Sequence, residues 1–289
     1  MKQTLGEKCF QILNYAVLAL LASTMIAPLL HLLAVSFSSP IAADSKKVFL
    51  IPVEFTFATW EHILQNEVLW RSFWITVFIT VVGTLLSMLF TVLTAFPLSR
   101  KEFMLRKPIM LAIVITMIFN APMIPFFLTV REVGLMDSIW ALIIPGLIST
   151  FNMVIVRTFF MGIPDDLDDA ARIDGCNEFR LLFQIYLQLS KPVLATIGLF
   201  YAVGYWNTFK TAVLFLRDPS LWPLQMRLRA FFTAEEELAA VDLIMGDFDF
   251  NTTTLKAATI IFATVPIVLV YPYLQKYFVK GAVLGSLKE

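Results

Sequence analysis

Long runs of hydrophobic residues alternate with shorter polar segments along this chain. Six of these runs approach or exceed the length of about 20 residues that a helix needs to cross the hydrocarbon core of a bilayer. They cover roughly residues 11–35, 73–96, 108–130, 139–160, 192–216 and 257–278. The pattern predicts an all-α membrane protein with six transmembrane helices in a single transmembrane domain over residues 1–289.

The first hydrophobic run, Gln11 to Val35, has a second interpretation as a secretion signal, because Ala34-Val35-Ser36 resembles a cleavage site. Its apolar part is longer than the roughly 7–15 residues typical of such signals. We therefore predict an uncleaved span.

The composition supports a membrane protein. Hydrophobic residues make up 58% of the chain and charged residues 15%, against about 45–50% and about 25% in soluble domains. Lys plus Arg and Asp plus Glu number 22 each, so the net charge gives no indication of a nucleic-acid partner. Cys9 and Cys176 are far apart in sequence, which predicts neither a disulfide nor a metal site.

Basic residues orient the predicted spans. The 97–107 connection contains four basic residues and one acid, whereas the 131–137 connection has Arg131 against Glu132 and Asp137. Positive charge is enriched on the cytoplasmic side of membrane proteins. We therefore expect both termini, a polar insert at 161–191 and the tail at 276–289 in the cytoplasm, and the 38–72 and 217–256 connections outside.

The second outward connection, 217–256, is acidic. It offers a surface to a soluble partner, or it is simply a solvated loop, and the sequence leaves both interpretations open. The acidic residues are Glu235, Glu236, Glu237, Asp242, Asp247 and Asp249.

Several residues within the spans are unusual for a bilayer interior. Prolines remove a backbone donor and are expected to bend or break these helices; they are Pro28, Pro122, Pro125, Pro145 and Pro266. Asn120, Asn152 and Asn207 either form hydrogen bonds between helices or line a polar path.

The chain lacks any obvious energy source of its own. No Asp, Glu or His lies at the middle of a predicted span, where ion-coupled carriers usually place an ionisable group. There is also no phosphate-binding loop, HExxH or GxSxG motif. We predict a transport subunit that is not an enzyme, binds no metal or cofactor itself, and receives energy for active transport from another subunit.

The insert at 161–191 is predicted to form two short helices. Pro164 suits a first helical turn, and the aspartates after it favour the positive end of a helix dipole. Ile163, Leu167, Ala170 and Ala171 recur at helical spacing, which predicts one apolar face. Gly175 is expected to end this first helix, and a second runs from about 178 to 189. The insert either transmits movement from a cytosolic motor or is a surface-lying connector.

A family resemblance rests on this insert. Asp169-Ala170-Ala171, three residues, Gly175, nine residues, then Ile185 and Leu187 resemble the EAA loop of bacterial ABC importer permeases. Asp169 stands where that family usually has Glu, and Gln188 where it usually has Pro. The segments at 205–207, 221–225 and 271–281 further resemble carbohydrate-uptake permeases of the MalG-type, LplC/YtcP-like branch.

The resemblance implies a type I ABC importer permease fold and a place in the bacterial cytoplasmic membrane, surrounded by lipid. The implied partners are a second homologous permease, two cytosolic ATPases that bind ATP and Mg, an extracytoplasmic solute-binding protein and an oligosaccharide. Transport would proceed by alternating access. The implied ATPase-coupling residues are Asp166, Asp168, Asp169, Ala170, Ala171, Gly175, Ile185 and Leu187, and the candidates for the substrate path are Asn120, Asn152, Trp206 and Asn207.

Other classes remain as alternatives. One is an ion-coupled carrier or channel that acts without an ATPase, and another is a membrane scaffold or receptor without transport. A permease of the same superfamily for amino acids or phosphate is a closer rival, which the matches at 222–225 and in the tail disfavour.

Overall fold

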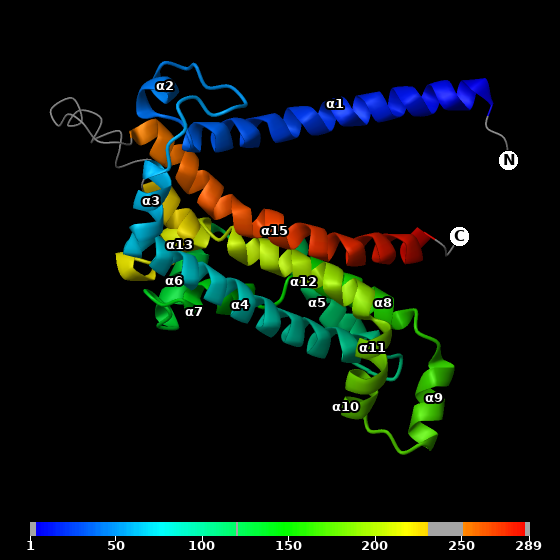
Figure 1. Ribbon diagram of the computed structural model, residues 1–289. Helices are drawn as coiled ribbons and strands as arrows, with labels where there is room; N and C mark the ends of the chain where they lie inside the picture. Colours follow the sequence, from blue (N-terminus) through cyan, green and yellow to red (C-terminus); the bar gives the residue numbers. More distant parts are fainter. Residues whose placement is uncertain (1–3, 120, 231–250, 287–289) are drawn as a thin grey trace. The chain divides into compact units, whose positions relative to one another are not determined.

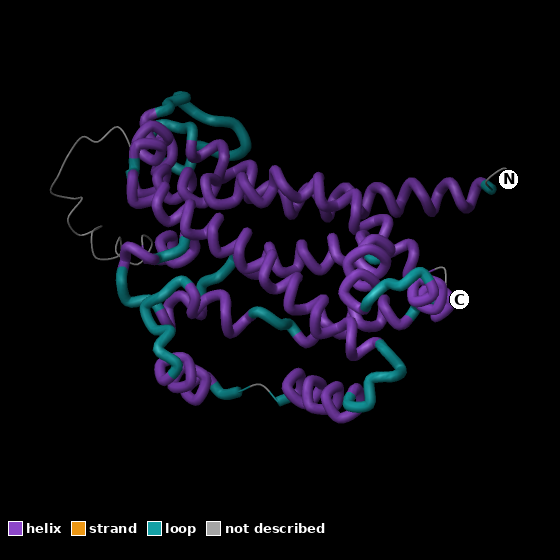
Figure 2. Tube along the Cα trace, turned by 90° about the horizontal axis from the view of Figure 1, so that it is seen from below, coloured by secondary structure: helices purple, strands orange, loops and turns teal. Residues whose placement is uncertain are grey.

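A computed structural model describes residues 4–119, 121–230 and 251–286. These residues form helices joined by loops, and no strand occurs among them (Figure 2). The all-α prediction is therefore confirmed. The chain folds as two compact units, the first made of residues 1–70 and 228–266 and the second of residues 71–227 and 267–289.

Three continuous helices among the described residues are long and apolar enough to cross a membrane. They lie within α1 (Leu5–Ser36), α4 (Glu67–Ser99) and α15 (Thr252–Ser286). Three bent pairs raise the count to as many as six if each pair forms one span. This upper count equals the number of spans that the sequence predicts.

The bent pairs break at defined points. The α5 helix (Arg106–Ile118) meets α6 (Met123–Glu132) at 119°, and α7 (Trp140–Ile143) with the 3₁₀ turn η1 (Ile144–Gly146) meets α8 (Thr150–Met161) at 46°. In the third pair, the segment 178–189 meets α12 (Lys191–Trp206) at 86°.

The predicted helix breaks occur at only some of the prolines. Pro122 and Pro145 lie at breaks, and Pro125 lies in the first turn of α6, where no helical hydrogen bond is lost. Pro28 and Pro266 instead lie inside the continuous helices α1 and α15. A single lost backbone bond does not end a long apolar helix, because the rest of the helix keeps its own hydrogen bonds.

One predicted boundary is wrong. The fifth span does not reach Leu216, because α12 ends at Trp206 and a separate helix, α13 (Lys210–Phe215), follows. Asn207 ends α12: its backbone N–H and its side-chain amide both donate to the Val203 carbonyl, at 3.1 and 2.9 Å. At the other end of the chain, α15 continues to Ser286 and includes most of the segment 276–289, whose place in the cytoplasm stays a prediction.

The first unit joins α1 to the beginning of α15 through short helices. The side chains of α1 are exposed along most of its length, as expected of a helix that faces lipid. Two helices follow it, α2 (Pro40–Asp44) and α3 (Ala58–Gln65). The Thr59 hydroxyl donates to the Thr254 hydroxyl across 3.2 Å, and the Asn251 amide donates to the Pro40 carbonyl across 3.0 Å.

The second unit contains the larger core, in which α4 packs against α12 (Figure 1). A row of hydroxyl groups on α4 pairs with tyrosines of α12. Ser87 shares a hydrogen bond with the Tyr205 hydroxyl at 2.8 Å, and Thr91 shares one with the Tyr201 hydroxyl at 2.7 Å. These buried polar pairs fix the register of the two helices, since a slip would leave them unsatisfied.

The close approach of α4 and α12 predicts that Gly83→Ala destabilises the second unit. A Cβ at this position would lie 2.8 Å from the Tyr205 ring, which its hydrogen bonds hold in place. Overpacking of this kind costs about 1–3 kcal/mol. A lower Tm of the purified protein would reveal the loss.

Gly198→Ala is the matched control for this prediction. A Cβ at residue 198 of α12 would have Met88 Sδ at 3.8 Å as its nearest neighbour, which is an ordinary contact. This variant should keep or slightly raise the Tm because alanine favours helix. Equal Tm values for the two variants would contradict the proposed tight packing at Gly83.

Candidate functional site

The first helix of the insert, α9 (Asp165–Ile173), forms where the sequence predicts it. Pro164 is its N-cap residue, and Asp165, Asp166 and Asp168 lie in its first turn, near the positive end of the helix dipole. Gly175 has a φ of +80°, in the left-handed region that glycine adopts without strain. The helix therefore ends because of its own sequence and needs no partner to end it.

The second half of the insert is also helical, with an irregularity that the sequence does not predict. Asn177 caps α10 (Glu178–Leu181) by accepting from the Arg180 backbone N–H at 2.8 Å. A π-helical turn, η2 (Leu182–Tyr186), and the short α11 (Leu187–Leu189) follow. The 86° bend then separates the insert from α12, so α9 and α10 extend beyond the ends of α4, α8 and α12 (Figure 1).

The predicted apolar face of α9 is divided between two sides of the helix, which corrects the prediction of one continuous face. Ile163 and Ala171 are buried, whereas Leu167 and Ala170 are exposed. The buried side of α9 contains Asp168 and Ala171. Leu167 and Ala170 each precede one of these residues by one position and are therefore rotated about 100° around the helix axis.

The predicted coupling residues thus occupy different surroundings. Asp166, Asp169, Ala170 and Gly175 are exposed and available to a partner. Ile185 and Leu187 are half-buried and pack against the core of the second unit. Asp168 and Ala171 are buried, so these two residues face the chain itself.

Asp168 is held by a cluster that we call the clasp, made of Arg100, Asp168 and Tyr186. Arg100 Nη1 donates to Asp168 Oδ2 and, at 2.5 Å, to the Tyr186 hydroxyl, which in turn donates to Asp168 Oδ2 at 3.0 Å. The Arg100 guanidinium also lies 5.2 Å from the Phe96 ring centre and 5.3 Å from the Tyr186 ring centre. The clasp joins residues from beside α4, from α9 and from η2.

Burial makes this ion pair energetically significant. The side chains of Arg100 and Asp168 are 11% and 10% exposed. Removing one partner of such a pair leaves a buried charge and costs about 3–5 kcal/mol. Burial lowers the pKa of Arg100, but the Tyr186 and Asp168 oxygens outweigh this effect and raise the pKa above its ordinary value. Burial also raises the pKa of the Tyr186 hydroxyl, so it stays protonated at neutral pH.

Exposed ion pairs surround the clasp. Lys101 Nζ donates to Asp165 Oδ2 at 2.6 Å, and this bond holds the pKa of Asp165 below its ordinary value. Arg172 pairs with Glu178 Oε1 at 2.8 Å. Such solvated pairs are weak individually. They connect the insert to residue 101 and connect its two halves to each other.

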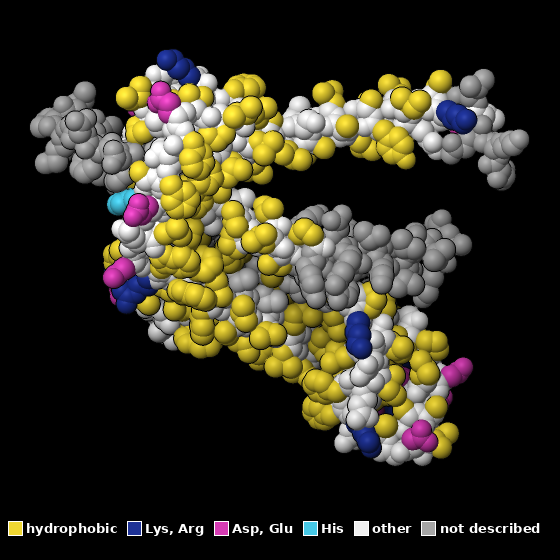
Figure 3. Space-filling model, in the orientation of Figure 1, with side chains coloured by type: hydrophobic (Ala, Val, Ile, Leu, Met, Phe, Trp, Pro, Cys, Tyr) yellow, Lys and Arg dark blue, Asp and Glu magenta, His cyan; other side chains and the backbone are white. Residues whose placement is uncertain are grey.

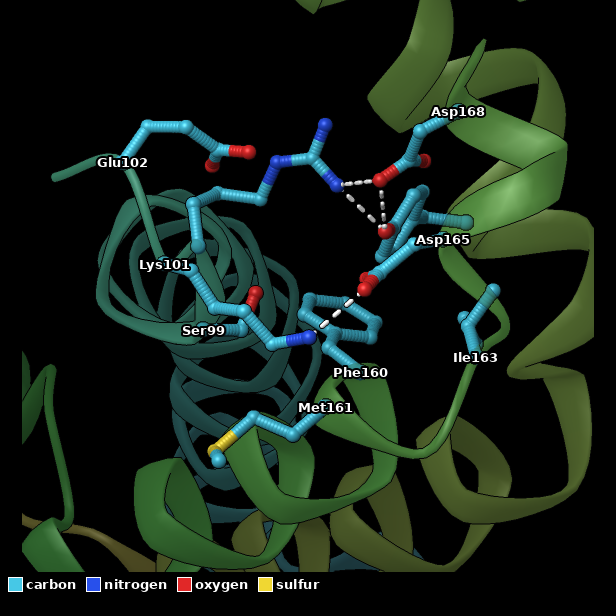
Figure 4. A pocket seen from close by; sticks show the side chains of 10 residues that line it. Ser99, Lys101, Glu102, Phe160, Met161, Ile163, Asp165 and Asp168 are labelled. Atoms are coloured by element: carbon cyan, nitrogen blue, oxygen red, sulfur yellow. Dashed lines mark hydrogen bonds and ion pairs between the residues drawn. The ribbon is translucent and has the colours of Figure 1, made fainter. Parts of the chain in front are cut away.

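A small pocket lies beside the clasp (Figure 4). It is lined by Ser99, Arg100, Lys101, Glu102, Phe160, Met161, Ile163, Asp165, Asp168 and Tyr186. The pocket has about 40 Å³ of space for the centres of water molecules, and one water needs roughly 10–15 Å³ by this measure. It therefore accommodates a few waters but not a sugar. Arg100 Nε and Asp168 Oδ1 are buried and have no hydrogen-bond partner among the described residues.

The candidates for the substrate path are not brought together as one described site. Asn152 is buried in α8. Trp206 is buried and packs edge-on against Phe73 with ring centres 6.1 Å apart, and Asn207 is an exposed helix cap. Asn120 lies outside the described residues, as do the acidic residues at 235–249.

Sequence reasoning missed Arg100 and Tyr186. It used Arg100 only as one of the basic residues that orient the chain. The available signal was the charge pattern: two adjacent basic residues follow an apolar helix, and the insert contains an excess of aspartates.

Comparisons with known proteins identify the family. Residues 63–283 match the model of the binding-protein-dependent transport system inner membrane component. The polygalacturonan/rhamnogalacturonan transport system permease protein YtcP of Bacillus subtilis (strain 168) is 43% identical over 98% of this chain and 99% of its own length. Protein LplC of the same organism is 38% identical over 100% of this chain and 98% of its own length.

A solved structure agrees in fold. The crystal structure of a bacterial ABC transporter involved in the import of the acidic polysaccharide alginate contains a chain that matches with a TM-score of 0.89 and 33% identity, over 96% of this chain and 99% of that chain. The family match and these similarities cover both compact units. The chain belongs to the family of inner membrane components of binding-protein-dependent transport systems.

Proposed function

We propose that this chain is a permease subunit of an ATP-driven ABC importer that carries an acidic oligosaccharide across the bacterial cytoplasmic membrane. Its partners would be a second homologous permease, two ATPases that bind ATP and Mg, and an extracytoplasmic binding protein. The permease moves the sugar by alternating between two states whose populations the ATPases shift. Hydrolysis takes place in the ATPases.

The observation that carries this proposal is the insert, which is fixed to its own chain on one side and exposed on the other. Leu167, Ile173 and Phe179 are exposed on two short helices that also carry many charges (Figure 3). The exposed fraction of Ile173 is 86%. Exposed apolar side chains beside a polar rim are typical of a docking surface for another protein. The insert therefore lies in the cytoplasm in this proposal, as do both termini.

The proposed substrate class has separate support. YtcP is named for the transport of polygalacturonan and rhamnogalacturonan, and the importer of the solved structure for that of alginate. Galacturonate units and alginate are acidic, so an oligosaccharide of uronic acids is the common chemistry. The family also favours an importer over an ion-coupled carrier or a scaffold, since its members are components of binding-protein-dependent transport systems.

A reconstituted importer tests the proposal. We expect proteoliposomes that contain this chain and its partner subunits to accumulate oligogalacturonate when the binding protein is outside and ATP is on the ATPase side. Maltotriose, a neutral sugar, is the matched control. It should be taken up at least about tenfold more slowly, because it leaves the groups that bind carboxylates without partners, which costs on the order of 1.4 kcal/mol of binding free energy or more.

Two results would contradict the proposal in different ways. Uptake by this chain alone, without ATPases or ATP, would favour the carrier or channel. ATP-driven uptake of maltotriose at the rate of oligogalacturonate would overturn the acidic substrate class but not the importer.

A further inference from the structure

We propose that Arg100 is a positioning residue that transmits displacement of the insert to α4. The inference rests on the proposed function, in which ATPases move the insert. It concerns a residue outside the insert and outside the surface available to the ATPases.

Arg100 lies at a fixed point of the second unit. It directly follows Ser99, the last residue of α4, and the end of that helix is held by Arg157, whose Nε donates to the Leu98 carbonyl at 2.8 Å. The Arg100 guanidinium is further restrained by the Phe96 and Tyr186 rings, which pack against each other edge to face with their centres 5.1 Å apart and both lie beside it. A force on this guanidinium therefore acts on the end of α4 and not on a freely moving side chain.

Both halves of the insert converge on this guanidinium. Asp168 of α9 and Tyr186 of η2 bind the same nitrogen, Nη1. Glu178 of α10 approaches Nη2 at 3.9 Å with one carboxylate oxygen and pairs with Arg172 of α9 through the other. Displacement of either half of the insert therefore exerts a force on the Arg100 guanidinium, because each half contacts it separately.

The chemistry of this position favours arginine specifically. A planar guanidinium contacts acceptors along its edge and aromatic rings with its faces, whereas a lysine ammonium is a compact charge without these directions. Lys101 next to it makes one exposed contact, to Asp165, with side-chain exposures of 72% and 69%. The rigid connection between the insert and α4 is thus at residue 100 and not at residue 101.

The test measures oligogalacturonate uptake per ATP hydrolysed in the assembled importer. Arg100→Met should lower this ratio about tenfold, within the usual range of coupling between sites, and should also lower the Tm because it leaves Asp168 as a buried unpaired charge. The double variant Arg100→Met with Asp168→Asn removes both charges. It should recover the Tm and the assembly of the complex but not the ratio.

The double variant separates positioning from stability. If Arg100 were only structural, restoring the Tm would restore uptake per ATP, and that result would overturn the inference. Lys107→Met, which removes an exposed charge in the first turn of α5, is the matched control and should leave the ratio unchanged. An equal drop in the control would also overturn the assignment to Arg100.

A third variant tests the inference if the double variant does not assemble. Arg100→Lys keeps the buried charge, so it should assemble while uptake per ATP falls several-fold; a normal ratio in an assembled Arg100→Lys importer would refute the inference. Absence of ATP-driven uptake by the unmodified importer would instead refute the proposed function, so the two failures are distinguishable.

Discussion

Gly175→Val is expected to abolish most ATP-driven uptake while the importer still assembles in the membrane. Residue 175 has a φ of +80°, and a β-branched side chain there costs roughly 1–3 kcal/mol in backbone strain. Apart from the two adjacent residues, no described residue has an atom within 4 Å of the position where its Cβ would stand, so strain and not a clash is the cause. The turn between α9 and α10 would relax to another geometry and misalign the two helices. Uptake per ATP hydrolysed is the measurement.

The chain offers a close control for this effect. Gly134 has a φ of +75°, and its Cβ position is equally clear of described residues other than its two neighbours, but it lies in the connection after α6. Gly134→Val introduces the same strain away from the insert and should keep the normal ratio. Gly175→Asn should be milder than Gly175→Val, because asparagine tolerates the left-handed region. Equal uptake by the two valine variants would rule out a specific role for the turn at Gly175.

Local signals made the insert predictable from sequence. Pro164 and the aspartates that follow it define the beginning of α9, and Gly175 defines its end, because each acts on its own turn of backbone. The predicted helix over 164–174 and the observed Asp165–Ile173 differ by one residue at each end. The hydrophobic runs likewise predicted the all-α class, since about 20 apolar residues in lipid have few alternatives to helix.

Tertiary contacts determine the features of the fold and site that the sequence did not predict. Helical spacing placed Leu167, Ala170 and Ala171 on one face, but the partner that selects the buried side is Arg100, 68 residues before Asp168. Spacing within one segment cannot reveal such a pair. For the same reason the sequence did not predict that Pro28 is tolerated inside α1 while the chain breaks at Pro145, because both have the same local effect on the backbone.

The contacts of polar residues in the spans were likewise not predictable from the sequence. The sequence left Trp206 and Asn207 between a sugar-binding role and packing. Trp206 packs against Phe73 but its buried Nε1 has no hydrogen-bond partner among the described residues, and Asn207 caps its helix. These contacts do not test sugar binding, which stays a prediction for both residues. The buried hydroxyls of α4 were not predicted, because Ser and Thr are frequent in apolar helices and only the facing tyrosines of α12 distinguish them.

The division of the α9 face yields the last prediction. Ala170→Glu is expected to prevent docking of the ATPases, because Ala170 is exposed on the face that we assign to the partner. A carboxylate buried without a partner at an interface costs about 3 kcal/mol, roughly a hundredfold in affinity. The permease itself should keep its Tm, since the new side chain points into solvent. Copurification of the ATPase subunits with this chain provides the measurement.

Two further variants make this prediction specific. Met104→Glu adds the same charge at a residue that is 90% exposed in the 101–105 connection, and it should leave ATPase docking intact. Ala171→Glu, one residue after Ala170, should lower the Tm instead, because Ala171 is 5% exposed and packs in the core of the second unit. Normal ATPase docking to the Ala170→Glu variant would show that the exposed side of α9 is not the coupling surface. The opposite behaviour of two adjacent alanines would show that the partner and the permease core each bind one side of the same short helix.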